Sequence, residues 1–287
     1  MKFAYLVMTE LRSLDKTIQQ LYDYIINPYE ADIFICVQQT FSDDNEKIKL
    51  FDKNVVYNEI YTKPDPNVYF GLDNNINIKI GNWNIHSNLQ IYINYHKMSQ
   101  IIEKYIDKYD YFITMRTDVC ILFPFPEKKL FENIQPALYT VDAKYCNHWG
   151  GCGFSVFIHK AFIMEYLSCY YTIISNKIYN SLLIDNFKIK GKIYSNQENF
   201  HKICLQIINN QDKKCNVLDN TKYIKNNNYY YTAKTLEDYT TWSKPELNST
   251  YNVICKYREQ CEEAYDNLKL WNNNNKWKYN NDYFYLE

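Results

Sequence analysis

The chain has 287 residues, 46% of them hydrophobic, and its charges nearly cancel, with 32 Lys and Arg against 33 Asp and Glu. This length suits one large α/β domain with appendages or two small domains. A formal net charge of −1 disfavours a general binder of nucleic acids or anionic membranes, because such proteins usually carry a basic surplus.

The sequence also lacks the marks of membrane insertion. No apolar run approaches the roughly 18 residues expected of a membrane-spanning helix. The apolar residues 1–8 are too few for a signal peptide and are soon followed by Glu10 and Arg12. We therefore expect no transmembrane segment and a cytoplasmic location, in the host cytoplasm if the chain is encoded by a virus. The 30 Tyr residues and frequent Asn, Ile and Lys indicate an AT-rich genome.

The cysteines predict neither a disulfide framework nor a zinc site. There are nine of them, an odd number, and no two are spaced as C-x-x-C. Several lie inside apolar runs, as Cys36 does, where reduced cysteine behaves as a small core residue.

The first 37 residues predict a strand, a helix and a second strand. Residues 2–8 and 31–37 are apolar runs typical of buried strands. Between them, Ser13 suits a helix N-cap, apolar residues recur at helical spacing, and Pro28 is expected to stop the helix. Two strands joined through a helix imply a parallel sheet.

The middle of the chain alternates polar and apolar segments. Residues 41–90 are polar and rich in Asn, and are expected to form loops and short pieces around a ligand site. An apolar stripe predicts a helix over about 89–108, and the run 109–115 predicts another buried strand. Pro124 and Pro126 then favour a loop.

The remaining pattern predicts strands at 136–141, 154–158 and 214–218 and helices at 161–174, 197–207 and about 251–271. The last helix has an apolar stripe that must be buried, by default against the preceding residues and otherwise against a second copy of the chain. The predicted fold is α/β, with a mixed, mostly parallel sheet flanked by helices and a helical C-terminal appendage.

The most informative motif is Arg116-Thr117-Asp118, at the end of the predicted strand 109–115. Alternate residues of a strand face the same side, so Arg116 and Asp118 are expected to point together into a cleft. A cation beside a carboxylate suits a phosphate group bound through a divalent metal. The alternative is a structural ion pair or a cap of the strand.

The order of these elements resembles that of GT-A-type glycosyltransferases, most of all those acting on surface or capsular polysaccharides in bacteria, with relatives in large DNA viruses. The matching pieces are spread over residues 2–218. They are Arg12 after the first strand, Asn27-Pro28, the strand at 31–35, the helix with Lys97, Arg116-Thr117-Asp118, the glycine-rich turn and strand at 150–158, and Gln197-Glu198-Asn199-Phe200.

The resemblance implies a GT-A-like (Rossmann-like) catalytic domain that binds a nucleotide sugar over residues 1–220. Residues 221–287 would form an Asn- and Tyr-rich helical extension packed on it. The implied activity is transfer of a sugar from a nucleotide-diphosphate donor, such as a UDP-sugar, to a hydroxyl of a glycan or protein. Asp118 would hold Mn²⁺ or Mg²⁺ and support catalysis, and Glu198 would be the general base, or would only complement its helix dipole.

The residues implied to contact the donor are Thr9, Arg12, Lys97, Arg116, Trp149, Gly150 and Gly151. For Arg12 and Lys97 the alternative is a solvated surface cation, and for residues 149–151 a hairpin turn with a core tryptophan. His201 lies three residues after Glu198 and is a metal or phosphate ligand or, alternatively, a satisfied buried histidine.

The chain also departs from the family pattern. Met8-Thr9-Glu10-Leu11 stands where the family has a glycine, and Arg116-x-Asp118 replaces the commoner D-x-D. These departures motivate a second hypothesis, a catalytically degenerate glycan-binding or structural protein on the same fold. The expected partners are the nucleotide-sugar donor and a glycan or glycoprotein acceptor, without nucleic acid, and the chain is expected to be a monomer or homodimer.

Overall fold

The computed structural model covers the 287 residues and describes most of the first 175 and short segments beyond them. The described residues are 1–11, 14–72, 79–80, 83–84, 89–117, 119–121, 125–141, 155–175, 188–189, 192–193, 201, 204–205, 221–225, 254–256, 277–280 and 283–286.

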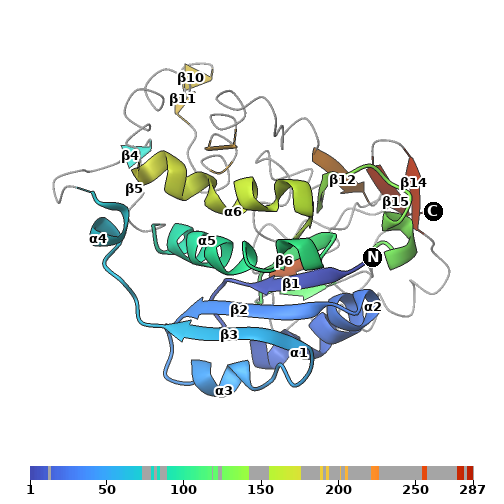
Figure 1. Ribbon diagram of the computed structural model, residues 1–287, viewed down its shortest axis with the longest axis horizontal. Helices are drawn as coiled ribbons and strands as arrows, with labels where there is room; N and C mark the ends of the chain where they lie inside the picture. Colours follow the sequence, from blue (N-terminus) through green and yellow to red (C-terminus); the bar gives the residue numbers. More distant parts are fainter. Residues whose placement is uncertain are drawn as a thin grey trace, which may run out of the picture.

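A nine-stranded sheet forms the centre of the molecule (Figure 1). Its order is β14 (Trp277–Asn280), β15 (Tyr283–Leu286), β12 (Thr221–Lys225), β8 (Leu138–Val141), β9 (Ser155–His159), β6 (Tyr111–Met115), β1 (Phe3–Val7), β2 (Asp32–Gln38) and β3 (Val55–Tyr61). Strands β3, β2, β1 and β6 are parallel neighbours. Strand β9 is antiparallel to both β6 and β8, β12 and β15 run parallel to β8, and β14 is antiparallel to β15. The predicted mixed, mostly parallel sheet is confirmed.

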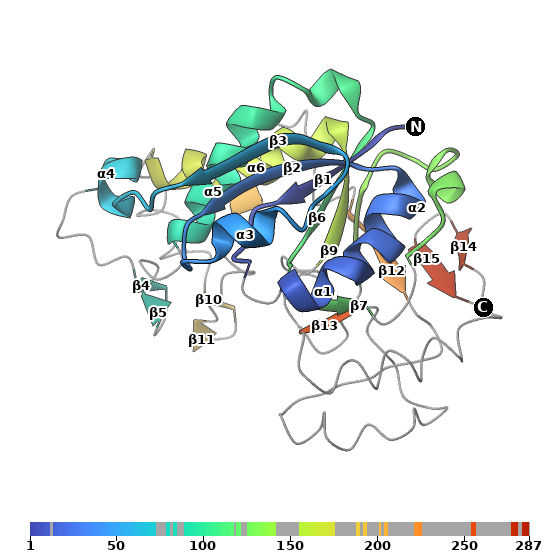
Figure 2. The same cartoon turned by 90° about the horizontal axis from the view of Figure 1, so that it is seen from below.

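Helices cover both faces of this sheet, as Figures 1 and 2 show. Helix α1 (Leu14–Leu21), the π-helical turn η1 (Tyr22–Ile26) and α2 (Asn27–Tyr29) lie on one face. Helices α5 (Leu89–Ile102) and α6 (Lys160–Ser175) lie on the other and pack on each other.

Shorter elements connect these layers. They are α3 (Asp44–Ile48), α4 (Pro66–Phe70), β4 (Lys79–Ile80), β5 (Trp83–Asn84), η3 (Ile106–Lys108), β7 (Val119–Ile121), η4 (Lys128–Phe131), β10 (Lys188–Ile189), β11 (Lys192–Ile193) and β13 (Ile254–Lys256). Strand β4 pairs with β5, β10 with β11, and β7 with β13, all antiparallel.

Two apolar cores arise from the alternation of side chains along the strands. In β1, Phe3 and Tyr5 point into the core beneath α1 and α2, whereas Ala4 and Leu6 point into the core beneath α5 and α6. All residues of β1 are buried, as expected for a central parallel strand covered on both faces. Aromatic rings fill much of both cores; the rings of Tyr92 and Tyr170, for example, stack 4.0 Å apart between α5 and α6.

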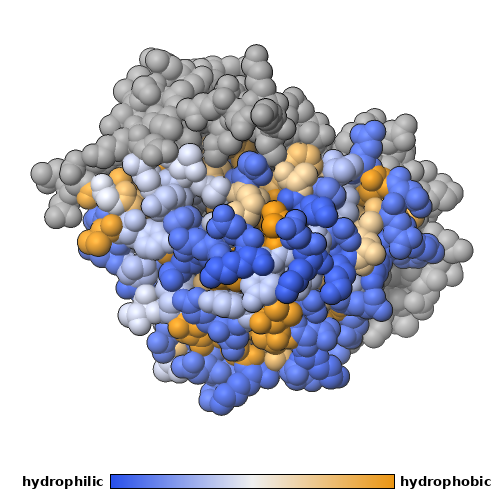
Figure 3. Space-filling view, viewed as in Figure 1, coloured by the Kyte–Doolittle hydropathy of each residue, from blue (hydrophilic) through white to orange (hydrophobic). Residues whose placement is uncertain are grey.

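The surface of the described residues is polar by comparison. Figure 3 shows one face on which hydrophilic residues predominate and apolar residues form separate patches. Among the described helices, none combines the length and the apolar character that crossing a membrane requires.

Several local predictions are wrong for identifiable reasons. Pro28 does not stop the first helical segment, because a π-helical turn over Tyr22–Ile26 precedes it and Pro28 occupies the first turn of α2, where no backbone donor is needed. The segment ends at Glu30, whose left-handed backbone has a φ of 50°. The polar residues 41–90 contain the short helices α3 and α4, in agreement with the expected loops and short pieces, but also the seven-residue strand β3, which was not expected.

The residues after 220 also differ from the predicted helical extension. Within the predicted helix over about 251–271, Ile254–Lys256 form strand β13, and the remainder lies outside the described residues. The other described segments of this part are strands β12, β14 and β15, which extend the central sheet. The predicted strand at 214–218 lies outside the described residues.

Candidate functional site at the carboxyl ends of β1 and β6

The connections of the sheet change direction between β1 and β6. From β1 the chain continues to β2 and β3 on one side, and β6 lies against β1 on the other. In open α/β sheets, ligands bind beyond the carboxyl ends of the strands at such a switch point. The two segments that leave these strands there are residues 8–11 and residues 116–117.

Thr117 joins these two segments. Its backbone N–H donates to the Thr9 hydroxyl over 3.3 Å, and its own hydroxyl donates to the Glu10 carbonyl over 2.6 Å. The Thr17 hydroxyl of α1 donates to the Thr117 carbonyl. Thr117 is fully buried, so these bonds replace water and hold both loops in one arrangement.

The predicted residues Thr9 and Arg116 are brought together by this junction. Arg116 follows the last residue of β6 directly and is half-buried, and Thr9 is half-buried on the neighbouring loop. At the base of the junction, the Tyr5 hydroxyl donates to the Met115 carbonyl over 3.4 Å. The junction therefore places the backbone of Arg116 beside the loop of Thr9 at the switch point.

A second set of bonds ties the loop after β1 to α5 and β3. The Asn94 side chain donates through Nδ2 to the Met8 carbonyl over 2.8 Å, and its Oδ1 accepts from the Tyr61 hydroxyl. Both side chains are buried. Burial raises the pKa of the Tyr61 hydroxyl, which keeps its proton and remains a donor.

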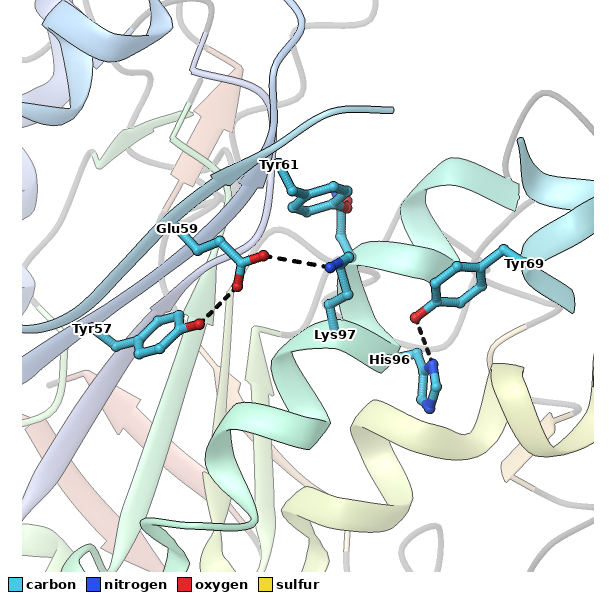
Figure 4. Close-up of polar contacts among 7 residues, drawn as sticks. Tyr57, Glu59, Tyr61, Tyr69, His96 and Lys97 are labelled. Carbon is cyan, nitrogen blue, oxygen red and sulfur yellow. Dashed lines mark hydrogen bonds and ion pairs between the residues drawn. The ribbon is translucent and has the colours of Figure 1, made fainter. Parts of the chain in front are cut away.

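Lys97 lies one turn further along α5 and is already engaged (Figure 4). Its ammonium is 3.4 Å from a Glu59 carboxylate oxygen and 4.4 Å from the centre of the Tyr61 ring. The Tyr57 hydroxyl donates to the other Glu59 oxygen over 2.7 Å, which raises the pKa of Tyr57 to about 12. The alternative of a freely solvated lysine is therefore wrong, and a ligand contact by Lys97 would compete with Glu59.

His96, the neighbour of Lys97, faces α4 and α6 instead. Its Nδ1 lies 2.7 Å from the Tyr69 hydroxyl, as Figure 4 shows, and its ring stacks on Tyr171 with centres 3.6 Å apart. Burial, and then the charge of Lys97, lower the pKa of His96 to about 4. The imidazole is therefore neutral near pH 7.

The other predicted site residues fall in two groups. Arg12, Asp118, Trp149, Gly150, Gly151 and Glu198 lie outside the described residues. His201 is buried, with Nε2 3.2 Å from the Tyr166 carbonyl and its ring between Tyr166 and Tyr170, which favours the satisfied buried histidine. Among the described residues, no group of three His, Cys, Asp or Glu side chains could hold a metal ion.

Sequence reasoning missed Asn94, Tyr61 and the anchoring role of Thr117. Asn94 and Tyr61 lie within segments whose pattern indicated only an apolar helix face and polar loops. Thr117 stands inside the Arg116–Asp118 motif, so its position was signalled, but its bonds connect residues more than 100 positions apart. Hydrogen-bond partners this distant in the sequence cannot be predicted from local sequence patterns.

Comparisons with known proteins leave the family open. No protein-family model matches the sequence, and no curated protein resembles it at a significant level. The chain is similar to a crystal structure of a glycosyltransferase involved in the glycosylation of the major capsid of PBCV-1, at 11% identity and a TM-score of 0.38, over 94% of this chain and 100% of that one. Similarity at this level establishes neither a common fold nor a shared activity.

Proposed function

We propose that the chain is a glycosyltransferase that binds a nucleotide-diphosphate sugar beyond the carboxyl ends of β1 and β6 and transfers the sugar to a hydroxyl of a glycan or protein acceptor. The observation that carries the proposal is the junction at Thr117, which holds the loops of Thr9 and Arg116 against each other at the switch point of the sheet. A site fixed before the ligand arrives loses little conformational entropy on binding.

Arg116 would bind the diphosphate. A guanidinium presents paired N–H donors that match two phosphate oxygens, and its charge is permanent. As the bond between the sugar and the diphosphate breaks, negative charge grows on the departing oxygen, and a fixed cation beside it lowers the barrier. Thr9 would add a neutral hydrogen bond, and Arg12 a second positive charge.

A divalent cation would be held by Asp118. Mn²⁺ and Mg²⁺ prefer carboxylate, phosphate and water ligands, and such an ion would supply further positive charge at the diphosphate. The described residues contain no metal cluster of their own. The ion would accordingly depend on Asp118 together with the oxygens of the bound diphosphate.

Glu198 would accept the proton of the acceptor hydroxyl as that oxygen attacks the anomeric carbon. The reaction passes through an oxocarbenium-like state, so the placing of the two sugars matters as much as proton transfer. Trp149, Gly150 and Gly151 would lie against the donor, the tryptophan by stacking and the glycines by close approach of the backbone.

The test is a thermal-shift panel of nucleoside diphosphates, each with and without Mn²⁺, on the wild-type chain, followed by donor hydrolysis. We expect at least one diphosphate to raise the Tm, and Arg116→Ala to remove that rise. Lys104→Ala, which deletes an exposed cation after α5, is the matched control and should retain it. Stabilisation by no diphosphate contradicts the proposal, and binding of glycans without any donor turnover supports the non-catalytic alternative.

A further inference from the structure

The side-chain amide of Gln90, in the first turn of α5, is buried without a hydrogen bond at either its Nε2 or its Oε1. Within the described part of the chain, Gln90 is the one side-chain amide with both its nitrogen and its oxygen buried and unpaired; the buried hydroxyls of Thr114 and Ser175 also have no partner. An unpaired buried amide destabilises the folded chain, so it requires a physical explanation.

Gln90 lies beyond the carboxyl ends of the central strands. Helix α5 runs from that edge towards the opposite one, because Asn94 meets Met8 after β1, whereas Tyr105, past the end of α5, packs on Phe34 near the start of β2. Gln90 precedes Asn94 by one turn and shares its helix face. The Gln90 amide therefore lies one helical turn beyond the level of the Met8 carbonyl, in the direction of the candidate site.

The groups around Gln90 are already satisfied by one another. The Tyr61 hydroxyl donates to Asn94, and Asn94 donates to Met8. A weak side-chain hydrogen bond from Gln90 opposes the rise in the pKa of the Tyr61 hydroxyl, but its geometry falls short of a full hydrogen bond, so neither amide atom counts as paired. If the amide rotates towards a ligand it gives up only this weak contact, and Gln90 as a residue is partly exposed.

We propose that Gln90 binds the base of the donor nucleotide, an inference that rests on the proposed function. A glutamine amide presents a donor beside an acceptor, and the edges of nucleobases present the complementary pair. Phosphate oxygens only accept hydrogen bonds, so they would leave Oε1 unpaired. Binding of the base would satisfy both amide atoms that are unpaired in the free chain.

The test is Gln90→Leu, for which stability and binding change in opposite directions. Removing an unpaired buried amide raises the Tm of the free chain, by about 1–3 °C. The same change weakens binding of the preferred nucleoside diphosphate by about 10-fold, since two hydrogen bonds to the base are lost. Pyrophosphate, which has no base, keeps its affinity.

Gln20→Leu is the matched control. Gln20 is also a buried glutamine on a helix, but its Oε1 accepts from the Ile121 backbone N–H over 2.8 Å. This variant should lower the Tm and leave the affinity of the folded chain for the nucleotide unchanged.

Each other outcome overturns the assignment. A lower Tm for Gln90→Leu means that the amide has a structural partner, and an unchanged Kd means that it does not contact the nucleotide. An equal loss of affinity for pyrophosphate or for ribose 5-phosphate moves the contact from the base to the phosphates or the ribose. If no nucleoside diphosphate binds the wild-type chain, the proposed function fails and this inference fails with it, whereas a nucleotide that binds both proteins equally removes only the role of Gln90.

Discussion

The hydroxyl of Thr117 donates to the backbone carbonyl of Glu10 over 2.6 Å, although 107 residues separate the two in sequence. This bond joins the loop after β6 to the loop after β1 at the candidate site. Because Thr117 is fully buried, its hydroxyl has no access to water that could replace this bond. The geometry of the site and the stability of the fold therefore depend on the same bond.

Thr117→Val keeps the shape of the side chain and removes its donor. We expect the free energy of unfolding to fall by about 0.5–1.5 kcal/mol, because the hydrogen bond between the buried hydroxyl and the Glu10 carbonyl is lost, and affinity for nucleoside diphosphates to fall with it. Urea denaturation measures the first and calorimetry the second. Thr40→Val is the control, since the Thr40 hydroxyl makes only an exposed 3.3 Å bond to the Gln38 carbonyl. Equal effects of the two substitutions would refute the anchoring role of Thr117.

Asn94 and Tyr61 should be energetically coupled. Tyr61→Phe removes the donor to the Asn94 Oδ1, and Asn94→Leu removes both the acceptor of the Tyr61 hydroxyl and the side-chain donor to the Met8 carbonyl. In a double-mutant cycle followed by chemical denaturation, we expect a coupling energy of about 1 kcal/mol or more. Additive single effects would mean that the two side chains do not act together.

His96 should make stability depend on pH. Burial and the charge of Lys97 lower its pKa from 6.5 to about 4 in the folded chain. Between these pH values the unfolded chain binds a proton that the folded chain does not. The stabilisation that results from this pKa difference is therefore complete above pH 6.5, and the free energy of unfolding declines as the pH falls towards 4.

His96→Gln tests this pH dependence and removes the titrating group. The loss of stability between pH 7 and pH 5, measured by urea denaturation, should be smaller in the variant than in the wild type. The pKa of His159 is also lowered by burial and acts in the same direction, but it is common to both proteins and cancels in the comparison. Identical losses would show that His96 is not responsible.

Asp118→Asn tests the proposed metal role with almost no change of shape. We expect sugar transfer to fall by about 10²-fold or more, because the leaving diphosphate loses the charge of its ion. The Mn²⁺-dependent part of nucleotide binding should disappear while the Tm of the free chain stays within about 1 °C. Unchanged turnover in Mn²⁺ would rule out the role.

The sequence by itself determined the central layers of the fold. The apolar runs at 2–8, 31–37 and 109–115 became β1, β2 and β6, because a strand covered on both faces must be apolar throughout. Helical spacing of apolar residues likewise located α5 and α6, although α5 ends at Ile102, earlier than the stripe suggested. Burial imposes these patterns locally, so they can be read without knowing any partner.

Other parts of the fold were decided only by tertiary structure. Strand β3 lies at the edge of the sheet, and its burial follows no regular alternation, with Val55 and Val56 exposed and Tyr61 buried, so it gave no strand pattern within the polar residues 41–90. Ile254–Lys256 pairs with β7, more than 130 positions earlier in the chain, and this distant partner overrode a local helical pattern. Propensity describes a segment alone, whereas strand pairing depends on what the fold places beside it.

In the candidate site, too, some residues could be predicted from the sequence and others only from the tertiary structure. The sequence indicated Thr9 and Arg116 because charged and polar residues that directly follow a buried strand can be recognised from the sequence alone. It gave no indication of Asn94 or Gln90, since a hydrogen bond from Asn94 to Met8 and an amide left unpaired at Gln90 exist only once α5 has docked on the sheet. Hydrophobic burial produces a periodic pattern in the sequence, but directional bonds between distant residues produce none, so Asn94 and Gln90 could be identified only in the folded chain.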